Sequence, residues 1–287
     1  ARDMFENEFS VSKKKADLVE TIVRVQEPVR NDGDGHDVFV FIPFCPTRCA
    51  YCSFVSVAID KQKKLIEPYV NCLLKEIEFL KEVVEKKDLK IRTVYVGGGT
   101  PTSIPTEYLD KILSALVPFK PFEFTVEAGR PDTINSSVLN VLKKNGVTRI
   151  SVNPQTFNDA TLERIGRRHK AEMVEEVYLE AKDDFDVNMD LIAILPGESL
   201  EDFKRTVDKA VELDAENVTV HTLYLKKGSA LKVGGYQSVD NDPAEKMVDY
   251  AYTALTGAGY VPYYMYRQKY TSGNLENVGY AKPDKIC

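Results

Sequence analysis

Six short apolar runs, each followed by a longer amphipathic stretch, leave few folds open to this 287-residue sequence. The runs span residues 38–42, 93–97, 123–128, 149–153, 187–194 and 217–225. Strand-like runs that alternate with helix-like stretches indicate repeated βα units and a parallel sheet. Six units predict an α/β fold built as a partial (β/α)6 TIM-like barrel, open on one side, with short N- and C-terminal appendages. A closed barrel needs eight units, and a doubly wound parallel sheet is the alternative.

Polar and small residues gather at the same end of these runs. Three cysteines come directly after the first run, and the segment GGGTPT (97–102) comes at the end of the second. The polar residues within or after the later runs are Glu127, Asn153, Gln155, Asp190, His221 and Tyr224. Both candidate folds place ligand-binding groups at the carboxyl ends of parallel strands. We therefore expect one site rather than scattered functional groups.

The strongest sign of chemistry is the run FIPFCPTRCAYCSF, in which Cys45, Cys49 and Cys52 have the spacing C-x3-C-x2-C. We call residues 45–52 the cysteine loop. A structural zinc site wants four protein ligands. A [4Fe-4S] cluster held by three cysteines leaves one iron open for a substrate or cofactor, whereas electron-carrier clusters usually take four cysteines. The spacing therefore favours a cluster with one open iron.

The cysteines have other interpretations. Free cysteines often pack as small buried hydrophobes, and a distant histidine (His36, His169 or His221) could complete a zinc site. A disulfide framework is disfavoured because five cysteines, an odd number, are spread over a long chain. Cys72 lies in an amphipathic stretch and is expected in the core, while Cys287 is the last residue and indicates nothing.

The residues after the other runs also have two interpretations each. Three glycines let a backbone approach a ligand closely, although GGG by itself usually marks a tight turn. Glu127 and Asp190 stand in apolar runs, and because acids are seldom buried without a partner, each either pairs with a structural base or holds a ligand. Gln155 and Arg167 pose the same question, and an arginine fork suits a carboxylate ligand well.

Composition narrows the partners and the compartment. A net charge of −6 and a pI near 5.4 provide no basic field for nucleic acid. No apolar run approaches the roughly 18 residues that span a bilayer, and no signal peptide opens the sequence. We expect a cytoplasmic protein with no membrane span.

The breaks in the pattern divide the chain into three segments. A helical N-terminal segment covers residues 1–36 and ends at the turn-rich NDGDGHD. The core covers 37–230, and an accessory C-terminal segment covers 231–287. We expect this last segment to be truncated, because the sequence begins with Ala1 and stops at KPDKIC without a tail.

Five segments, in this order, resemble those of the oxygen-independent coproporphyrinogen III oxidase-like family of radical S-adenosylmethionine (SAM) enzymes: FIPFCPTRCAYCSF, VYVGGGTPT, TVEAGRP, SVNPQTFNDATLERIGR and MDLIAILPGE. The cysteine loop is similar to the superfamily pattern C-x3-C-x-aromatic-C. The resemblance covers about residues 37–230. The stretch YVPYYMYRQKYTSGNLENVGY extends it to about residue 283 and is similar to the coproporphyrinogen dehydrogenase branch of Gram-positive bacteria.

The resemblance implies that Cys45, Cys49 and Cys52 ligate a [4Fe-4S] cluster. It implies SAM contacts at Phe39, Tyr51, Gly98, Gly99, Thr100, Glu127, Gln155, Arg167 and Asp190. The family usually opens with Y-x-H-I-P-F-C, where this chain has Phe39 and Phe41, so the tyrosine hydroxyl and the imidazole are absent while the ring packing is kept. Ile194 stands where the family commonly has a glycine before Leu-Pro, which we expect to be a minor change in backbone freedom.

The activity implied is cleavage of SAM to methionine and a 5′-deoxyadenosyl radical, used for oxidative decarboxylation of coproporphyrinogen III propionates to vinyl groups in haem biosynthesis. The partners implied are a tetrapyrrole substrate or haem and a low-potential electron donor such as flavodoxin or ferredoxin. Two alternatives remain: a radical SAM enzyme that modifies haem or another tetrapyrrole, and a non-catalytic haem chaperone that keeps the cluster and SAM. The sequence assigns no catalytic residue.

Tyr224, Arg267 and Lys269 are the predicted substrate contacts. Cationic side chains suit the propionates of a tetrapyrrole, and the tyrosines between residues 260 and 270 would stack on its rings, since large flat ligands prefer aromatic walls. The alternative for this tyrosine-rich stretch is an ordinary edge strand with an aromatic face.

Overall fold

The computed structural model describes residues 2–30, 33, 35–54, 56–237, 241–267, 271, 273 and 275–286. The chain forms two compact units. The larger unit comprises Gly33–Asp190 and Leu225–Gln237, and the smaller unit comprises Ala1–Asp32, Leu191–Tyr224 and Ser238–Cys287. These units divide the chain differently from the three predicted segments (1–36, 37–230 and 231–287), which stay a prediction.

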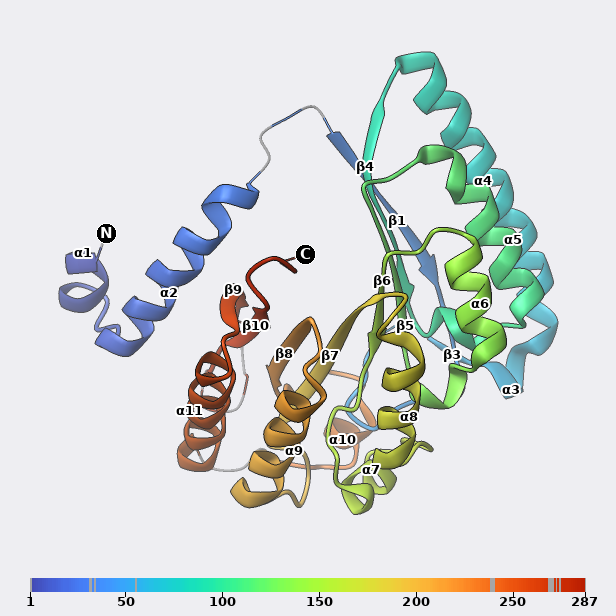
Figure 1. The fold of residues 1–287 in the computed structure, drawn as a ribbon. Coiled ribbons are helices and arrows are strands. Elements are labelled where there is room, and N and C mark those ends of the chain that lie inside the picture. The colour runs from blue at the N-terminus through green and yellow to red at the C-terminus, as the bar shows by residue number, and fades with distance from the viewer. Residues whose placement is uncertain are drawn as a thin grey trace. The chain divides into compact units, whose positions relative to one another are not determined.

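Parallel strands form the centre of the larger unit, in the order β1-β4-β5-β6-β7. Their bounds are β1 Gly35–Ile42, β4 Lys90–Gly98, β5 Glu123–Gly129, β6 Arg149–Val152 and β7 Asp186–Ala193. The end of β7 belongs to the smaller unit. The helices between the strands are α3 Ile59–Gln62, α4 Ile66–Lys87, α5 Thr106–Leu116, α6 Ser136–Lys144, α7 Asp159–Arg164 and α8 Ala171–Ala181. Figure 1 shows α4, α5 and α6 along one face of these strands.

Burial of both faces of the sheet explains why the sequences of these strands are continuous apolar runs. A parallel sheet covered by helices buries side chains on both faces, so its strands need not alternate apolar and polar residues. All four residues of β6 are buried. Val94, Val126, Ile150 and Val187, one from each of four neighbouring strands, are fully buried. The predicted runs thus form the predicted strands, and the sixth run forms β8 (Asn217–Thr222) in the smaller unit.

Local sequence explains where helix α6 begins and ends. The Asn135 side chain accepts a hydrogen bond from the backbone N–H of Val138 (3.0 Å) and caps the start of α6. Gly146, one residue beyond the C-cap, has φ +75°, which glycine adopts at little cost. The prediction for Cys72 is wrong, because this residue of α4 is exposed. Burial in α4 follows a stripe through Val70 and Leu73, and Cys72 lies off it by about one residue's rotation.

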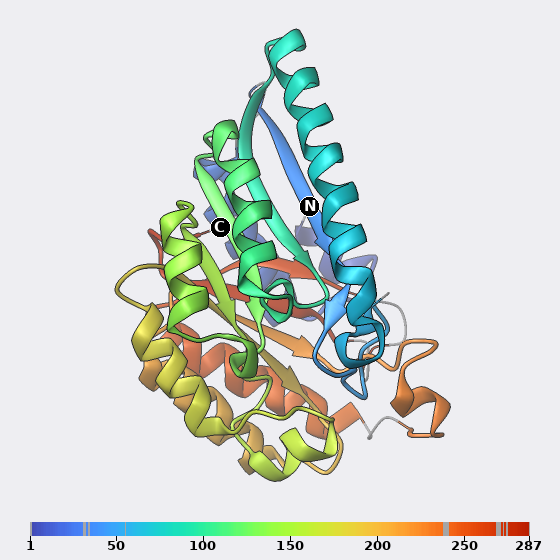
Figure 2. The same cartoon turned by 90° about the vertical axis from the view of Figure 1, so that its right-hand side faces the viewer.

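The register of the larger unit brings the strand ends together. Ile42 at the end of β1 pairs with Gly98 at the end of β4, and Gly129 at the end of β5 pairs with Val152 at the end of β6. Figure 2 shows β1 and β4, in blue and blue-green, running side by side behind α4. The segments that follow these strands therefore start from one edge of the sheet.

Helices and antiparallel strands form the smaller unit. Its helices are α1 Arg2–Asn7, α2 Lys13–Gln26, α9 Leu200–Leu213 and α11 Asn241–Gly257. Its strands include β8, β9 Val261–Tyr266 and β10 Asn277–Ala281, and β10 pairs antiparallel with both β8 and β9. β9 ends the strand order, and its Tyr264 is 47% exposed. Residues 261–266 of the tyrosine-rich stretch therefore form an edge strand, as its structural interpretation predicts, and residues 268–270 lie outside the described residues.

Ile194, just after β7, shows what the family's glycine provides. Its φ is +67°, in the left-handed region that glycine adopts freely and that a β-branched residue strongly disfavours. The expectation that this replacement is a minor change in backbone freedom is therefore wrong. Among the described residues, no helix is long and apolar enough to cross a membrane.

Candidate active site

The cysteine loop follows β2 (Phe44–Cys45) and leads into β3 (Val57–Ala58), which pairs with β2 in parallel. Other parts of the larger unit hold it in place. The Ala50 N–H donates to the carbonyl of Ile165 (2.9 Å), and the Ala50 carbonyl accepts from Leu231 (3.0 Å), in the short helix α10 (Ala230–Val233). The Thr47 hydroxyl donates to the carbonyl of Gly166 (3.1 Å). The three cysteines are thus presented on a tethered loop.

The cysteines are free thiols, as a metal site requires. The Cys52 N–H donates to the carbonyl of Cys49 (3.0 Å), which closes a turn between them. Burial raises the pKa of the Cys52 thiol. Among the described residues, no three His, Cys, Asp or Glu side chains converge on one point as they would around a single ion. A four-iron cluster takes one thiolate at each of three irons, so it does not require such convergence.

Residues 97–102 (GGGTPT), which we call the glycine segment, pack directly against Cys45. The N–H groups of Gly99 and Thr100 donate to the carbonyls of Ile42 (2.8 Å) and Phe44 (2.7 Å). The Thr100 hydroxyl lies 3.5 Å from Cys45 Sγ. A Cβ on Gly99 would lie 2.6 Å from the Phe44 oxygen and 3.0 Å from Cys45 Sγ, so only glycine fits. The backbone of this segment therefore lies very close to β2, the strand that carries Cys45.

Asp190 joins the ends of β6 and β7. The Asn153 side chain donates to the Asp190 carboxylate (2.9 Å) and accepts from the Asp190 N–H (3.1 Å). The Gln155 N–H donates to the Asp190 carbonyl (2.9 Å). Gln155 has φ +65°, a strained conformation for a residue other than glycine, and such strain is typical of functional sites. On the neighbouring strand β5, the Glu127 carboxylate accepts from the Ser151 hydroxyl (3.3 Å).

Arg167 connects this polar group with the cysteine loop. Its guanidinium donates to the carbonyls of Gly129 (3.4 Å) and Asn153 (3.3 Å) and to the Tyr51 hydroxyl (3.1 Å). Burial raises the pKa of Tyr51 and acts to lower that of Arg167. Interactions with Tyr51, including its hydrogen bond, with Cys49 and with the carboxylate of Asp132 outweigh burial and raise the pKa of Arg167, so the guanidinium stays charged. Its Nε is buried, and no described residue offers it a hydrogen-bond acceptor.

These contacts bring most of the predicted site residues together in the larger unit. Tyr51, Gln155, Arg167 and Asp190 belong to one network through Asn153. Glu127 is tied to the same strand ends through Ser151, whose hydroxyl also accepts the Gly129 N–H (3.0 Å). Phe39 lies in β1, where it is 61% exposed and packs on the ring of Tyr95, with 5.7 Å between the centroids.

The predicted substrate contacts lie elsewhere in the chain. Tyr224 and Arg267 belong to the smaller unit. Tyr224 is half-buried and forms an isolated bridge with Thr271, while Arg267 is exposed. Lys269 lies outside the described residues.

Two further buried residues lie beside this network, and the sequence predicted neither of them as a cluster or SAM contact. Arg130, 3% exposed, donates to the Thr47 hydroxyl in the cysteine loop (2.7 Å). His169 is 2% exposed, and among the described residues neither of its ring nitrogens has a hydrogen-bond partner of normal geometry; burial, aided by Arg167, lowers its pKa to about 4. The sequence could have indicated Arg130, because this residue follows an apolar strand in the same segment as Glu127. It could not have indicated His169, because a lone histidine after GRR does not indicate burial.

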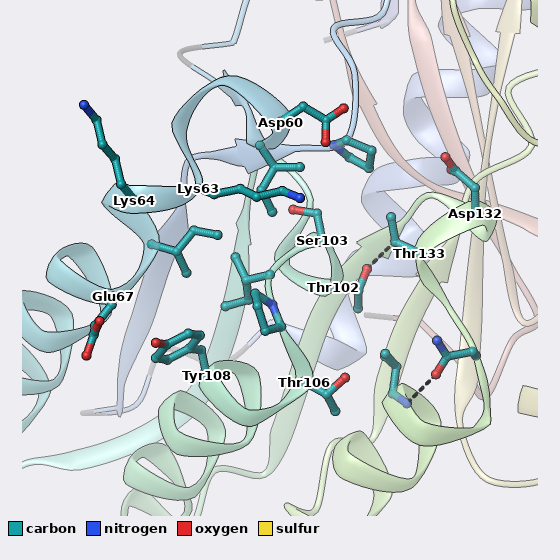
Figure 3. Close-up of a pocket in the computed structure, with 17 residues that line it drawn as sticks. Asp60, Lys63, Lys64, Glu67, Thr102, Ser103, Thr106, Tyr108, Asp132 and Thr133 are labelled. Carbon is teal, nitrogen blue, oxygen red and sulfur yellow. Dashed lines mark hydrogen bonds between the residues drawn. The ribbon is translucent and has the colours of Figure 1, made fainter.

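A cavity of about 630 Å³ lies beside the cysteine loop. Pro46 of the loop lines it, together with residues around the starts of α4, α5 and α6. Figure 3 shows the hydroxyls of Thr102 and Thr133 hydrogen-bonded at its wall (2.6 Å), with Asp132 close by. None of the predicted SAM contacts is among the residues that line this cavity. Thr102, Asp132 and Thr133, which do line it, are only close to those contacts in the sequence.

The donor set and the packing fit a cluster with SAM beside it. Three free thiols stand on one tethered loop, a glycine backbone abuts the first of them, and a buried guanidinium carries an unused N–H. The family model of the radical SAM superfamily matches residues 39–210. The chain belongs to this superfamily. Its members use a [4Fe-4S] cluster and SAM, so both predicted cofactors are confirmed at the level of the family.

Relatives support the narrower resemblance. The chain is 40% identical over 259 residues to the oxygen-independent coproporphyrinogen-III oxidase-like protein HemZ of Bacillus subtilis, covering 87% of this chain and 52% of HemZ. It is 35% identical over 195 residues to the heme chaperone HemW of the same species, covering 66% of this chain and 50% of HemW. The chain thus spans about half the length of these relatives. The predicted likeness to the oxygen-independent coproporphyrinogen III oxidase-like family is confirmed.

The fold also matches a solved structure. The coproporphyrinogen III oxidase HemN of Escherichia coli superposes with a TM-score of 0.71 at 21% identity, covering 91% of this chain and 58% of HemN. At that identity the likeness shows the fold. It confirms the predicted radical SAM type of α/β architecture over the alternative of a doubly wound sheet.

Proposed function

We propose that this chain is a radical SAM enzyme that cleaves SAM to methionine and a 5′-deoxyadenosyl radical, for oxygen-independent oxidative decarboxylation of coproporphyrinogen III propionates to vinyl groups. The observation that carries the SAM site is the network in which Arg167 joins the cysteine loop, through Tyr51, to the polar ends of the strands. The tetrapyrrole substrate rests on the 40% identity to a coproporphyrinogen-III oxidase-like protein over 87% of the chain.

Each part of the network has a role in this proposal. Cys45, Cys49 and Cys52 would hold the [4Fe-4S] cluster, which supplies one-electron reduction at its open iron when bound. The backbone at 98–100 would bind the amino group of SAM. Arg167 would bind the carboxylate of SAM through donors such as its unpartnered Nε. These residues orient the cofactor and exclude water around it.

Acceptors on the neighbouring strands would bind the rest of SAM. Asp190 and Glu127 offer carboxylate oxygens for the ribose hydroxyls, with Gln155 beside them. Asn153 and Ser151 hold the two carboxylates through hydrogen bonds of 2.9 and 3.3 Å. The arrangement orients each acceptor before the ligand arrives, which lowers the entropic cost of binding.

Substrate binding is proposed for residues of the smaller unit. Arg267 and Lys269 would bind propionate carboxylates as cations, and Tyr224 would pack against the macrocycle. The electron donor proposed is a low-potential carrier such as flavodoxin or ferredoxin. Phe39 and Phe41 replace the family's tyrosine and histidine, so this chain would bind SAM and its substrate without those two polar groups.

A haem chaperone is the second candidate function. The observation that favours it is the 35% identity to HemW of Bacillus subtilis, which is named a heme chaperone. A chaperone would keep the cluster and SAM and bind haem tightly without turning it over. A radical SAM enzyme that modifies haem or another tetrapyrrole would share the SAM chemistry but give a different product.

One anaerobic experiment separates these functions. The cluster is reconstituted, SAM, dithionite and coproporphyrinogen III are added, and 5′-deoxyadenosine is followed together with tetrapyrrole mass. Loss of carbon dioxide and hydrogen from the tetrapyrrole with matching 5′-deoxyadenosine is the expected result. 5′-Deoxyadenosine with an unchanged tetrapyrrole rejects the decarboxylase and directs the test to haem, and haem binding without any 5′-deoxyadenosine supports the chaperone. The Cys49→Ala variant is the control without a cluster.

A further inference from the structure

We propose that Arg130 is a positioning residue of the cluster site. Its guanidinium fixes the cysteine loop through Thr47, and its positive charge beside Cys49 raises the reduction potential of the cluster. The inference deepens the proposed function and rests on it, because the charge acts on a cluster bound by the three cysteines.

The hydrogen bonds of Arg130 give the guanidinium one orientation. Nη1 donates to the Thr47 hydroxyl (2.7 Å) and to the Thr47 carbonyl (3.3 Å), and the same nitrogen lies 4.0 Å from Cys49 Sγ. Nε and Nη2 donate to the two oxygens of Asp132 (2.9 and 2.8 Å). This two-point fork holds the plane of the guanidinium and leaves its other edge toward the cysteine loop.

The backbone explains why the side chain reaches the loop. Gly129 ends β5 with φ +62°, a conformation that favours glycine. Arg130 then has an extended backbone and precedes a short 3-10 helix, Pro131–Thr133. The chain thus turns at the carboxyl end of β5, and the turn fixes both Arg130 and its partner Asp132. Thr102 ties the turn to the glycine segment, because its hydroxyl donates to the carbonyl of Ala128 (3.1 Å).

The charges of this pair are not placed symmetrically around the site. The Arg130 side chain is 4% exposed, and its partner Asp132 is 14% exposed and lines the cavity of Figure 3. The positive end of the pair therefore faces the buried Cys49, while the negative end faces the cavity. The nearer charge has the larger Coulomb interaction because this energy falls with distance, and the low effective dielectric constant of a buried setting makes the difference between the two charges larger.

A charge in this position acts on the redox state of a cluster. Reduction adds one negative charge to a cluster that its thiolates already make negative, so a neighbouring cation favours the reduced form. Hydrogen bonds to the cluster sulfurs and the net charge around them are known determinants of the potential. Arg130 supplies both a charge and an N–H directed to a ligand sulfur, which predicts a potential higher than the thiolates alone would give.

Arg149 provides a matched control inside the same unit. Its side chain is also 4% exposed and also pairs with carboxylates, those of Glu123 (3.3 Å) and Asp186 (3.4 Å). It stands at the start of β6, at the opposite end of the strands from the cysteine loop. Replacing Arg149 removes a buried, paired arginine without touching the site.

The test is a redox titration of the reconstituted cluster, followed by electron paramagnetic resonance without substrate. We expect Arg130→Gln to lower the midpoint potential by about 60 mV, which is about a tenfold change in the ratio of reduced to oxidised cluster for one electron. Arg130→Lys keeps the charge and should stay near the wild-type value. Asp132→Asn removes the counter-charge and should raise the potential. Arg149→Gln should leave it unchanged.

Several results would overturn the proposal. One is an Arg130→Gln protein with a fully assembled cluster and the wild-type potential, and another is an equal shift in Arg130→Lys, which would deny the role of charge. If the Arg130→Gln protein fails to assemble a cluster, the Asp132→Asn variant provides the test instead. A midpoint potential of the Asp132→Asn cluster that is lower than or equal to the wild-type value rejects the charge effect.

The loop-fixing role has a readout that needs no cluster. Hydrogen–deuterium exchange in the cysteine loop of the cluster-free protein should rise in Arg130→Gln and stay at the wild-type level in Arg149→Gln. Unchanged exchange in Arg130→Gln rejects this role. A wild-type protein that binds no cluster would reject the proposed function, and the exchange measurement would still decide whether Arg130 fixes the loop.

Discussion

The two ends of the strands in the larger unit bury arginines in opposite ways. At the starts of β5, β6 and β7, Arg149 is surrounded by the carboxylates of Glu123 and Asp186 and by the side chain of Asn188 (3.0 Å). At the carboxyl ends of the same strands, Arg167 donates to two carbonyls and to the Tyr51 hydroxyl, and within the described part of the chain its Nε has no partner.

This difference distinguishes an arginine with a structural role from an arginine that can bind a ligand. A buried charge costs a large desolvation energy unless hydrogen bonds and an opposite charge compensate it. Arg149 has that compensation within the protein, so it needs nothing from outside. Arg167 has hydrogen bonds and feels the charge of Asp132, but no carboxylate of the described residues lies within ion-pair distance of it, and a ligand with a carboxylate would supply that contact. The same residue type is therefore structural at one end of the sheet and available to a ligand at the other.

The largest effect is expected from the cysteines. Cys49→Ala removes one of the three proposed cluster ligands, so reconstitution should give almost no iron-sulfur absorbance and no SAM cleavage. Cys72→Ala changes an exposed cysteine of α4 and should leave both at the wild-type level. A Cys49→Ala protein that still binds four irons would contradict the cluster assignment, and iron content with the visible spectrum decides the matter.

The comparison between the two arginines is tested directly by two matched variants. Arg167→Met should weaken SAM binding to the reconstituted protein by about 10- to 100-fold, since a charged hydrogen bond contributes about 1.5–3 kcal/mol. Arg149→Met should leave SAM binding unchanged and lower the free energy of unfolding by about 2–3 kcal/mol, because it strands carboxylates that are only partly exposed. Calorimetric titration and urea unfolding measure the two effects. Equal losses of SAM affinity in Arg167→Met and Arg149→Met would contradict the proposed difference between the two ends of the strands.

Gly99→Ala sharpens the comparison at the cysteine strand. The added Cβ would lie 2.6 Å from the Phe44 oxygen and 3.0 Å from Cys45 Sγ, which forces the strand that carries Cys45 to shift. We expect a loss of about 2–3 kcal/mol in unfolding free energy together with reduced iron uptake. Gly146→Ala, where no atom lies within 4 Å of the added Cβ, tests backbone strain alone and should cost about 1 kcal/mol with normal iron uptake. Normal iron uptake in Gly99→Ala would argue against this tight packing.

The smallest effect concerns pH. Burial lowers the pKa of His169 to about 4, below the usual 6.5 of the unfolded chain. Between these values the unfolded state binds a proton that the folded state does not, so stability rises with pH and is lost as pH falls from 6.5 toward 4. The loss should reach about 1.5 kcal/mol between pH 6.5 and pH 5. Urea unfolding of the wild type and of His169→Phe across this range measures it, and parallel curves would show that His169 is not responsible.

Much of this architecture follows from local sequence. The strands β1 and β4 to β8 were predictable because each is a continuous apolar run between turns, whereas β9 and β10 were not among the predicted runs. The cysteine loop was predictable because its spacing is specific. The exposure of Cys72 was not, since an amphipathic stretch defines a buried stripe only after its rotation against the sheet is known. Ile194 was misjudged for a related reason, because φ +67° arises from how β7 turns at its end and not from the residue itself.

The sequence by itself determined the order of strands and helices, the three thiolates and the position of polar residues at one end of the strands. Those properties depend on periodicity and spacing within short segments. Only the tertiary structure joined Tyr51 to Arg167, 116 residues apart, and Thr47 to Arg130, 83 residues apart. Such pairs depend on strand register and on the turn after each strand, where hydrogen-bond geometry must be met within a few tenths of an ångström. No local pattern encodes that distance.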